Sequence, residues 1–121
     1  MRSKISTPTL ISIVLTSLLS GNVSANDDPE ILYNSARNQL GLIMYCVGRG
    51  HTSAEAVGKY HRILATLPKP SDTANADKFE YEGSLGNNYD GISSVSIETI
   101  AQGMGITVAE RCAQLEALTK Q

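Results

Sequence analysis

The stretch Leu40-Gly41-Leu42-Ile43-Met44-Tyr45-Cys46-Val47-Gly48-Arg49-Gly50-His51 decides how the rest of the chain is organised. It carries Cys46, one of only two cysteines in 121 residues, near the end of an apolar helical pattern. Gly48 and Gly50 then provide typical helix terminators. The sequence therefore predicts a core helix over about residues 29–47. Its apolar face recurs at steps of four, four, three and four, through Leu32, Ala36, Leu40, Ile43 and Val47.

Residues 1–25 have the features of a secretory signal peptide. Arg2 and Lys4 form a short basic region, an apolar run follows, and small residues at 23–25 suit a signal peptidase. We therefore expect cleavage after these residues, a periplasmic or secreted location, and one helical domain over residues 26–121. An uncleaved membrane anchor is the alternative.

The charge of the mature chain excludes some classes of partner. Residues 26–121 keep all twelve acidic side chains but only eight of the ten basic ones, so their formal charge is −4 with neutral histidines. Proteins that bind nucleic acid or anionic membranes carry basic clusters, which this chain lacks. No later apolar run approaches eighteen residues, so we expect no membrane association after cleavage. The length suits one small domain with a single core.

Two cysteines in an exported chain predict one disulfide, between Cys46 and Cys112. Both cysteines fall on apolar helical stripes, so both are expected to face inward. In the chain-entropy model, closing a loop of this size is worth about 4 kcal/mol. Two free buried thiols are the alternative. A metal site is not expected, because two cysteines and two histidines offer no close ligand spacing.

Two further helices are predicted after the core helix. Thr52-Ser53-Ala54-Glu55 has the spacing of a capping box, and Pro68 ends the helix that follows, over about 53–67. The short connection makes this helix an antiparallel or steeply crossed neighbour of the core helix. The segment over about 73–84 is weakly amphipathic, which predicts a marginal surface helix. Gly41 in the core helix allows another helix to approach closely.

A flexible loop is predicted after residue 84, because glycine, asparagine and aspartate are concentrated there. Asp90-Gly91 is also a hairpin signal, but the flanking residues do not alternate in hydropathy, so a loop is favoured over a β-hairpin. Two short helices complete the chain. The first begins with Ser94 or Ser96 as its cap and ends at Gly105, and the second follows a capping box at Thr107.

These elements predict an all-α fold. We expect a compact bundle of four to five short helices, in which the disulfide joins the first and last helices. The core helix lies at the centre of this arrangement.

Residues 97–109 resemble the DNA-binding helix-turn-helix family. That motif has an alanine in its first helix, followed four residues later by a turn glycine, an aliphatic residue and a capping Ser or Thr. The matching positions are Ala101, Gly105, Ile106 and Thr107. The resemblance implies a recognition helix, but Arg111 is the only basic residue of that helix before Lys120. Because phosphate contacts supply most DNA affinity, we expect a helix–helix corner and no nucleic acid partner.

Candidate functional residues gather around the glycine-rich loop. Tyr81 and Tyr89 flank this loop and are the aromatic pair expected at the surface. A merely disordered loop is the alternative. The candidate partner surface consists of Phe79, Tyr81, Tyr89 and Asp90.

His51 and His61 are candidate pH-responsive residues, because histidine titrates between pH 5 and 8. Solvated histidines without a role are the alternative. No GxSxG, HExxH or phosphate-loop motif is present, and the disulfide would consume the thiolate of any Cys–His pair. We therefore assign no catalytic residue, metal ligand or cofactor.

The combination of signal peptide, short helical chain and one long-range disulfide resembles two classes of bacterial protein. These are the periplasmic acid-stress chaperones of enteric bacteria and the small periplasmic immunity proteins that neutralise toxins delivered between bacteria. No functional residue is carried over, because no motif is shared. A signature typical of small exported proteins of Gram-negative bacteria is formed by Asn38–Gly41, Tyr45-Cys46, Gly50-His51 and Ala109–Cys112.

The leading expectation is an exported, non-enzymatic binding protein of the immunity type, with one loop presented on a disulfide-clamped scaffold. Its partner would be another protein, met through an acidic, tyrosine-containing surface. An acid-stress chaperone is the first alternative, and a small secreted hydrolase is the second.

Overall fold

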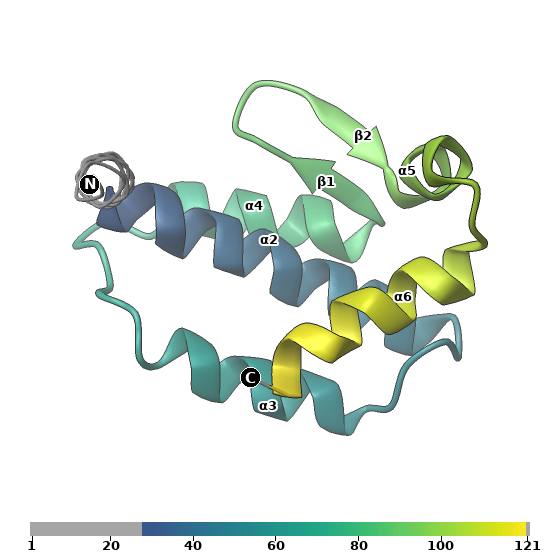
Figure 1. Ribbon diagram of the computed structural model, residues 1–121. Helices are drawn as coiled ribbons and strands as arrows, with labels where there is room; N and C mark the ends of the chain where they lie inside the picture. Colours follow the sequence, from purple (N-terminus) through teal and green to yellow (C-terminus); the bar gives the residue numbers. More distant parts are fainter. Residues whose placement is uncertain (1–27, 121) are drawn as a thin grey trace, which may run out of the picture.

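The computed structural model describes residues 28–120 (Figure 1). The predicted signal peptide lies outside these residues. Within them, no helix combines the length and the apolar character that crossing a membrane requires.

Helix α2 (Pro29–Gly48) is the central element, as the sequence predicts. It begins where Asp28 Oδ1 accepts a hydrogen bond from the Glu30 backbone N–H at 2.9 Å, with proline at the first helical position. It ends at a glycine turn, in which Gly50 has a φ of +78°. The predicted apolar face is wrong at its start, because Leu32 is 44% exposed whereas the neighbouring Tyr33 is buried.

Helix α2 is covered on two sides. Helix α3 (Glu55–Leu64) runs back along it, and α6 (Val108–Ala117) packs near its C-terminal half (Figure 1). Helix α4 (Ala74–Ser84) lies against the other side. Helix α2 therefore has buried residues both on the side that faces α3 and α6 and on the side that faces α4. The largest fully buried side chains of the protein are Leu40, Ile43, Cys46, Ile97 and Cys112.

The Cys46–Cys112 disulfide joins α2 to α6, which confirms the predicted pairing. The two Cα atoms are 5.7 Å apart, and neither side chain is exposed to solvent. The 3₁₀ helix η2 (Leu118–Lys120) continues α6 and contacts α3. The disulfide therefore positions the end of the described chain against α3.

The predicted capping box of α3 is wrong. Ser53 Oγ accepts from the Glu55 backbone N–H at 3.2 Å, whereas Thr52 Oγ1 is buried and has no hydrogen-bond partner among the described residues. The helix also ends earlier than predicted, at Leu64. Hydrogen bonds from Thr66 and Leu67 reach back only three residues, so the chain leaves the helix through tight turns before Pro68.

Helix α4 is not the marginal surface helix that its weak amphipathicity predicts. It packs closely on α2 through glycine on both helices, and Ala76 is fully buried. Small residues and backbone make this contact, so no apolar stripe is needed.

A β-hairpin replaces the predicted loop. Strands β1 (Asn87–Tyr89) and β2 (Ser94–Ser96) pair antiparallel, with Asn88 opposite Val95. The fold is therefore mostly helical and only roughly all-α. The Asp90 side chain stabilises the turn between the two strands, because its Oδ1 accepts from the backbone N–H groups of Ile92 and Ser93 at 2.8 Å.

Helix α5 (Ile97–Met104) follows β2, with Ser96 Oγ accepting from the Thr99 N–H at 3.1 Å. Gly105 has a φ of +74°, and the predicted capping box of Thr107 and Glu110 forms at the start of α6. The predicted helix–helix corner at Gly105 is thus confirmed.

Candidate functional site

Asn38 attaches the hairpin to the helical layer. Its side chain is 4% exposed, and its Nδ2 donates to the backbone oxygens of Phe79 at 2.9 Å and Asn87 at 3.0 Å. Its Oδ1 accepts from the Tyr89 backbone N–H at 3.3 Å. One buried amide therefore links α2, α4 and β1, and fully paired buried amides of this kind specify one arrangement of the elements they join.

A pocket of about 420 Å³ lies beside this amide, between α2, α4 and β1. We call it the hairpin pocket. The Phe79 and Tyr89 rings form one wall, with their centroids 4.9 Å apart in an edge-to-face arrangement. Its lining residues include Ile31, Asn34, Ser35, Phe79, Tyr89 and Asp90.

Asn34 lies one helical turn before Asn38 and also lines the hairpin pocket. It is 8% exposed, and its buried Oδ1 has no hydrogen-bond partner within residues 28–120. A buried polar atom without a partner costs free energy. A ligand that hydrogen-bonds the Asn34 amide, after rotation of its side chain where needed, would remove this cost.

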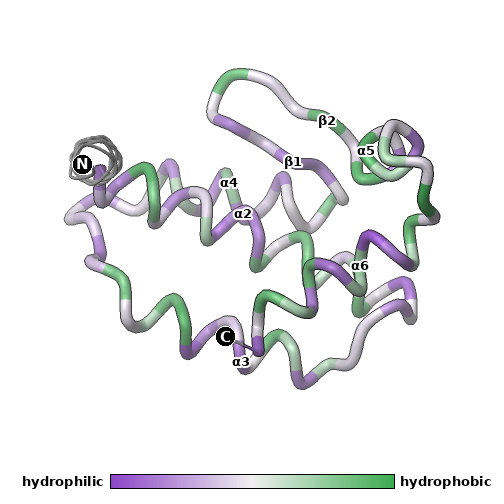
Figure 2. Tube along the Cα trace, in the orientation of Figure 1, coloured by the Kyte–Doolittle hydropathy of each residue, from purple (hydrophilic) through white to green (hydrophobic). Residues whose placement is uncertain are grey.

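Asp90 supplies negative charge at the mouth of the hairpin pocket. The backbone N–H groups of Ser93 and Ile92 donate to its carboxylate, and these hydrogen bonds lower its pKa below the ordinary value. The exposed carboxylate therefore stays ionised at neutral pH. Ile92 lies between the two strands and is 92% exposed. Figure 2 shows a hydrophobic segment at the tip of the hairpin.

Three of the four residues of the predicted partner surface thus meet at one pocket, and Tyr81 does not. Phe79 and Tyr81 are two positions apart on α4, and side chains at that spacing point to different faces of a helix. Tyr81 is 62% exposed and lies outside the hairpin pocket.

The two histidines lie away from the hairpin pocket. His51 is exposed in the turn after α2, and His61 is exposed on α3. His61 lines a separate pocket of about 380 Å³ together with Arg37 and Glu80. Within residues 28–120, no group of three or more His, Cys, Asp or Glu side chains is placed to hold a metal ion.

An ion-pair cluster that the sequence did not reveal joins α2 to α4. Arg37 Nη2 lies 2.6 Å from Asp77 Oδ1, and Arg37 Nε lies 2.6 Å from Glu80 Oε1. Burial alone would lower the pKa of Arg37, but the hydrogen bonds to Asp77 and Glu80 outweigh it and raise the pKa above its ordinary value. Arg37 therefore stays charged and holds the two helices together.

The sequence indicated no structural role for Asn34 or Asn38, although Asn38 belongs to the Asn38–Gly41 signature. Polar residues four positions apart inside an apolar helical stretch are the signal that could have identified them. Comparisons of the chain with protein-family models, curated proteins and solved structures found no match.

Proposed function

We propose that this protein is exported and acts by binding another protein, without catalysis, as a toxin-neutralising protein of the immunity type. The observation that supports this best is the meeting of Phe79, Tyr89 and Asp90 at the hairpin pocket. Aromatic walls, one charge and a few hydrogen-bonding groups are typical of pockets that receive an anchoring side chain of a partner.

The charge around the hairpin pocket favours a basic partner surface. Residues 71–98, which include α4 and the hairpin, contain six acidic side chains and only one basic side chain, Lys78. Opposite charges steer association and suppress wrong partners. Lys78 of this chain already lies over the Tyr89 ring, 5.5 Å from its centroid. A lysine or arginine of the partner can pair with Asp90 and lie against Phe79.

The scaffold favours tight binding because it is rigid before the partner arrives. The hairpin is fixed to α2 by Asn38, and α2 is joined to α6 by the disulfide. A preformed surface loses less conformational freedom on binding than a mobile loop.

A growth competition tests the immunity proposal. A strain of the source bacterium that lacks this gene is mixed with its parent on a solid surface, and the surviving cells of each strain are counted. We expect the deletion strain to be killed and the intact gene to restore survival. Equal survival of the deletion strain and its parent would contradict the immunity proposal.

A pocket-filling variant tests the role of the hairpin pocket in the same assay. Ser35→Arg places a long cationic side chain at the pocket from an exposed helical position, so it should abolish protection. Ala113→Arg, on the exposed surface of α6, adds the same charge elsewhere and should still protect. Loss of protection in both variants, or in neither, would contradict the assignment of the partner to this pocket.

An acid-stress chaperone is the second candidate, supported by two hydrogen-bonded carboxylates. Asp90 holds the hairpin turn, and Glu98 Oε2 accepts from the Tyr45 hydroxyl at 2.8 Å. Protonating Asp90 weakens the hairpin turn, and protonating Glu98 weakens the contact between α2 and α5; loosening of these parts would expose apolar surface. Dye binding that stays unchanged between pH 7 and pH 2 would exclude this candidate.

A secreted hydrolase has less support, because neither histidine lines the hairpin pocket. A substrate screen tests it, and any activity found must disappear in His51→Ala and His61→Ala.

A further inference from the structure

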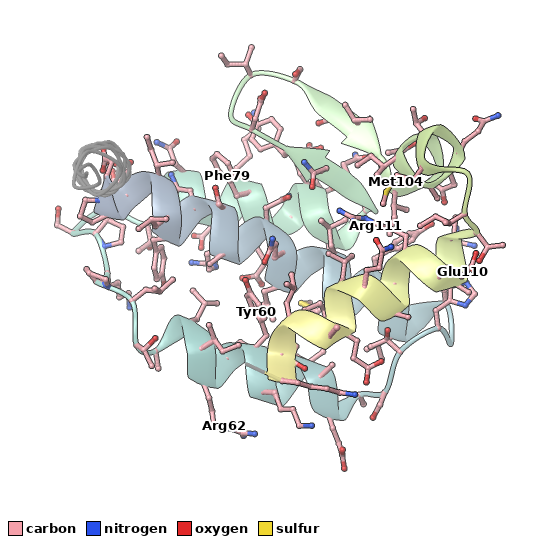
Figure 3. All side chains as sticks on the ribbon, viewed as in Figure 1. Tyr60, Arg62, Phe79, Met104, Glu110 and Arg111 are labelled. Carbon is pink, nitrogen blue, oxygen red and sulfur yellow. A yellow bond between two sulfur atoms is a disulfide. The ribbon has the colours of Figure 1, made fainter. Side chains whose placement is uncertain are left out.

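A groove of about 740 Å³ lies between α3 and η2. It lies on the other side of α2 from the hairpin pocket, as the positions of Tyr60 and Phe79 in Figure 3 illustrate. We call it the basic groove. The lining residues used below are Gln39 of α2, Lys59, Arg62 and Ile63 of α3, and Leu118 and Lys120 of η2.

The basic groove concentrates positive charge on a chain that is acidic as a whole. Of the lining side chains that the structure describes, three are basic and none is acidic. Within residues 28–120 the only ion pairs are those of Arg37, so Lys59, Arg62 and Lys120 have no carboxylate partner there. Residues 56–70 contain three basic side chains and no acidic one, the reverse of the segment around the hairpin. A groove lined by one sign of charge focuses the field and concentrates ions of opposite sign.

The floor of the basic groove adds a neutral hydrogen-bond donor. The buried Tyr60 hydroxyl donates to Gln39 Oε1 at 2.6 Å, which fixes the orientation of the Gln39 amide. Its Nε2 group has no partner within the described residues and can donate to a ligand. Ile63 and Leu118 supply apolar surface beside these polar groups.

The chemistry of these side chains decides which ligand would fit. The planar guanidinium of Arg62 can donate two parallel hydrogen bonds to a carboxylate or phosphate, and lysine ammonium groups act as point charges for the same ions. Arg62 is exposed to solvent, and in Figure 3 it extends from α3 away from the body of the molecule. Small-molecule sites have volumes of about 300–1,000 Å³, a range that includes this groove.

We propose that the basic groove binds a small ligand that carries two or more carboxylate or phosphate groups. The three cations pair with the anionic groups, the Gln39 amide donates to one of them, and Ile63 and Leu118 cover the carbon skeleton. Among the described residues this site shares only Gln39 with the lining of the hairpin pocket, and the proposal does not depend on the proposed function.

Titration of the full mature protein with citrate and with pyrophosphate tests the proposal at low salt. Citrate represents polycarboxylates and pyrophosphate represents phosphates, and binding is followed by calorimetry and by amide chemical shifts. We expect saturable binding of at least one anion, with shift changes confined to α3, η2 and the residues around Gln39. The tighter of the two anions identifies the ligand class.

Two double variants with the same net charge separate the site from general electrostatics. Lys59→Gln with Arg62→Gln removes two cations of the basic groove, and we expect binding at least about tenfold weaker. Lys78→Gln with Arg111→Gln removes two cations outside the groove, and we expect a change within about twofold. Lys120→Gln alone, at the end of the described chain, should weaken binding about threefold without affecting the fold.

Three results would overturn the proposal. The first is the absence of binding by either anion at about 10 mM. The second is equal weakening in the two double variants, which would show a general charge effect. The third is a set of chemical-shift changes that maps to the hairpin and not to α3.

Discussion

Gly41 of α2 and Gly83 of α4 face each other where the two helices pack. A Cβ atom added to Gly41 would lie 2.7 Å from the Ser84 backbone nitrogen, and one added to Gly83 would lie 2.8 Å from the Leu42 backbone nitrogen. Side chains never approach backbone this closely, so the close packing of the two helices requires glycine at both positions. This contact places α4, and with it Phe79, beside α2.

Gly41→Ala should therefore destabilise the protein strongly. The methyl group meets rigid backbone of α4, and overpacking of this kind typically costs about 1–3 kcal/mol or more. The free energy of unfolding, measured by urea denaturation, checks this value. Gly83→Ala should have a similar effect, because the same two helices must separate.

Gly58→Ala is the matched control. Gly58 lies in α3 with nothing within 4 Å of an added Cβ, so alanine should stabilise the helix by about 1 kcal/mol through its higher helix propensity. If Gly41→Ala were as stable as Gly58→Ala, the close packing of α2 and α4 would be wrong.

Asn38→Ala should loosen the hairpin. The substitution removes the side-chain partner of the Asn87 backbone oxygen and of the Tyr89 backbone N–H, and an unpaired buried group costs about 1–3 kcal/mol. We expect lower stability in urea and faster amide hydrogen exchange in β1 and β2.

Asn34→Leu provides the contrast on the same helix face. Its buried oxygen has no partner to lose within the described residues, so replacing it with an apolar side chain should be neutral or stabilising. Equal destabilisation by the Asn34 and Asn38 variants would contradict the hydrogen-bonding roles assigned to them.

Local signals in the sequence predicted the ends of most helices. Ser96, one of the two predicted caps of α5, and the Thr107 capping box act as predicted, because a cap depends on residues within one turn of it. Cys46 and Cys112 were predicted to pair because an exported chain with two cysteines leaves one choice.

Contacts between distant segments could not be predicted in the same way. Helix α4 is weakly amphipathic because glycine and alanine, not large apolar side chains, make its contact with α2. The hairpin lacks alternating hydropathy because Asn38, 49 positions before Asn87, holds it in place. The hairpin pocket depends on the α2–α4 contact and on the attachment of the hairpin by Asn38. The sequence therefore identified three residues of the pocket, but not the side-chain amides of Asn34 and Asn38 that lie beside them.

Removing the disulfide should lower stability by about 4 kcal/mol, the value expected for a loop with a sequence separation of 66. The test compares the double variant Cys46→Ala/Cys112→Ala with the wild-type protein, the latter measured with and without reductant. Urea denaturation should give similar values for the double variant and the reduced wild type. Alkylation and mass spectrometry of the protein isolated without reductant provide the check on the bond itself, since labelling of two free thiols would contradict it.

Stability should fall in acid through Asp90 and Glu98. Hydrogen bonds from Ser93 and Ile92 lower the pKa of Asp90, and the Tyr45 hydroxyl lowers that of Glu98. A lowered pKa means that the stabilising contribution is present above the ordinary value, near pH 4, and is lost as the pH falls through the folded-state value. The melting temperature should therefore drop below about pH 4.

The opposite sign applies to Tyr45, whose pKa is raised chiefly by its hydrogen bond to Glu98. Its contribution is present below about pH 10 and is lost as the pH rises through its folded-state pKa.

The double variant Asp90→Asn with Glu98→Gln tests the acid prediction. It keeps hydrogen-bond acceptors at both sites but removes their titration, so its melting temperature should fall less steeply below about pH 4 than that of the wild type. If the melting temperature of the double variant fell as steeply in acid as that of the wild type, the acid sensitivity would belong to other carboxylates. In that case the hairpin turn and the Tyr45–Glu98 bond would not be the acid-labile part of the fold.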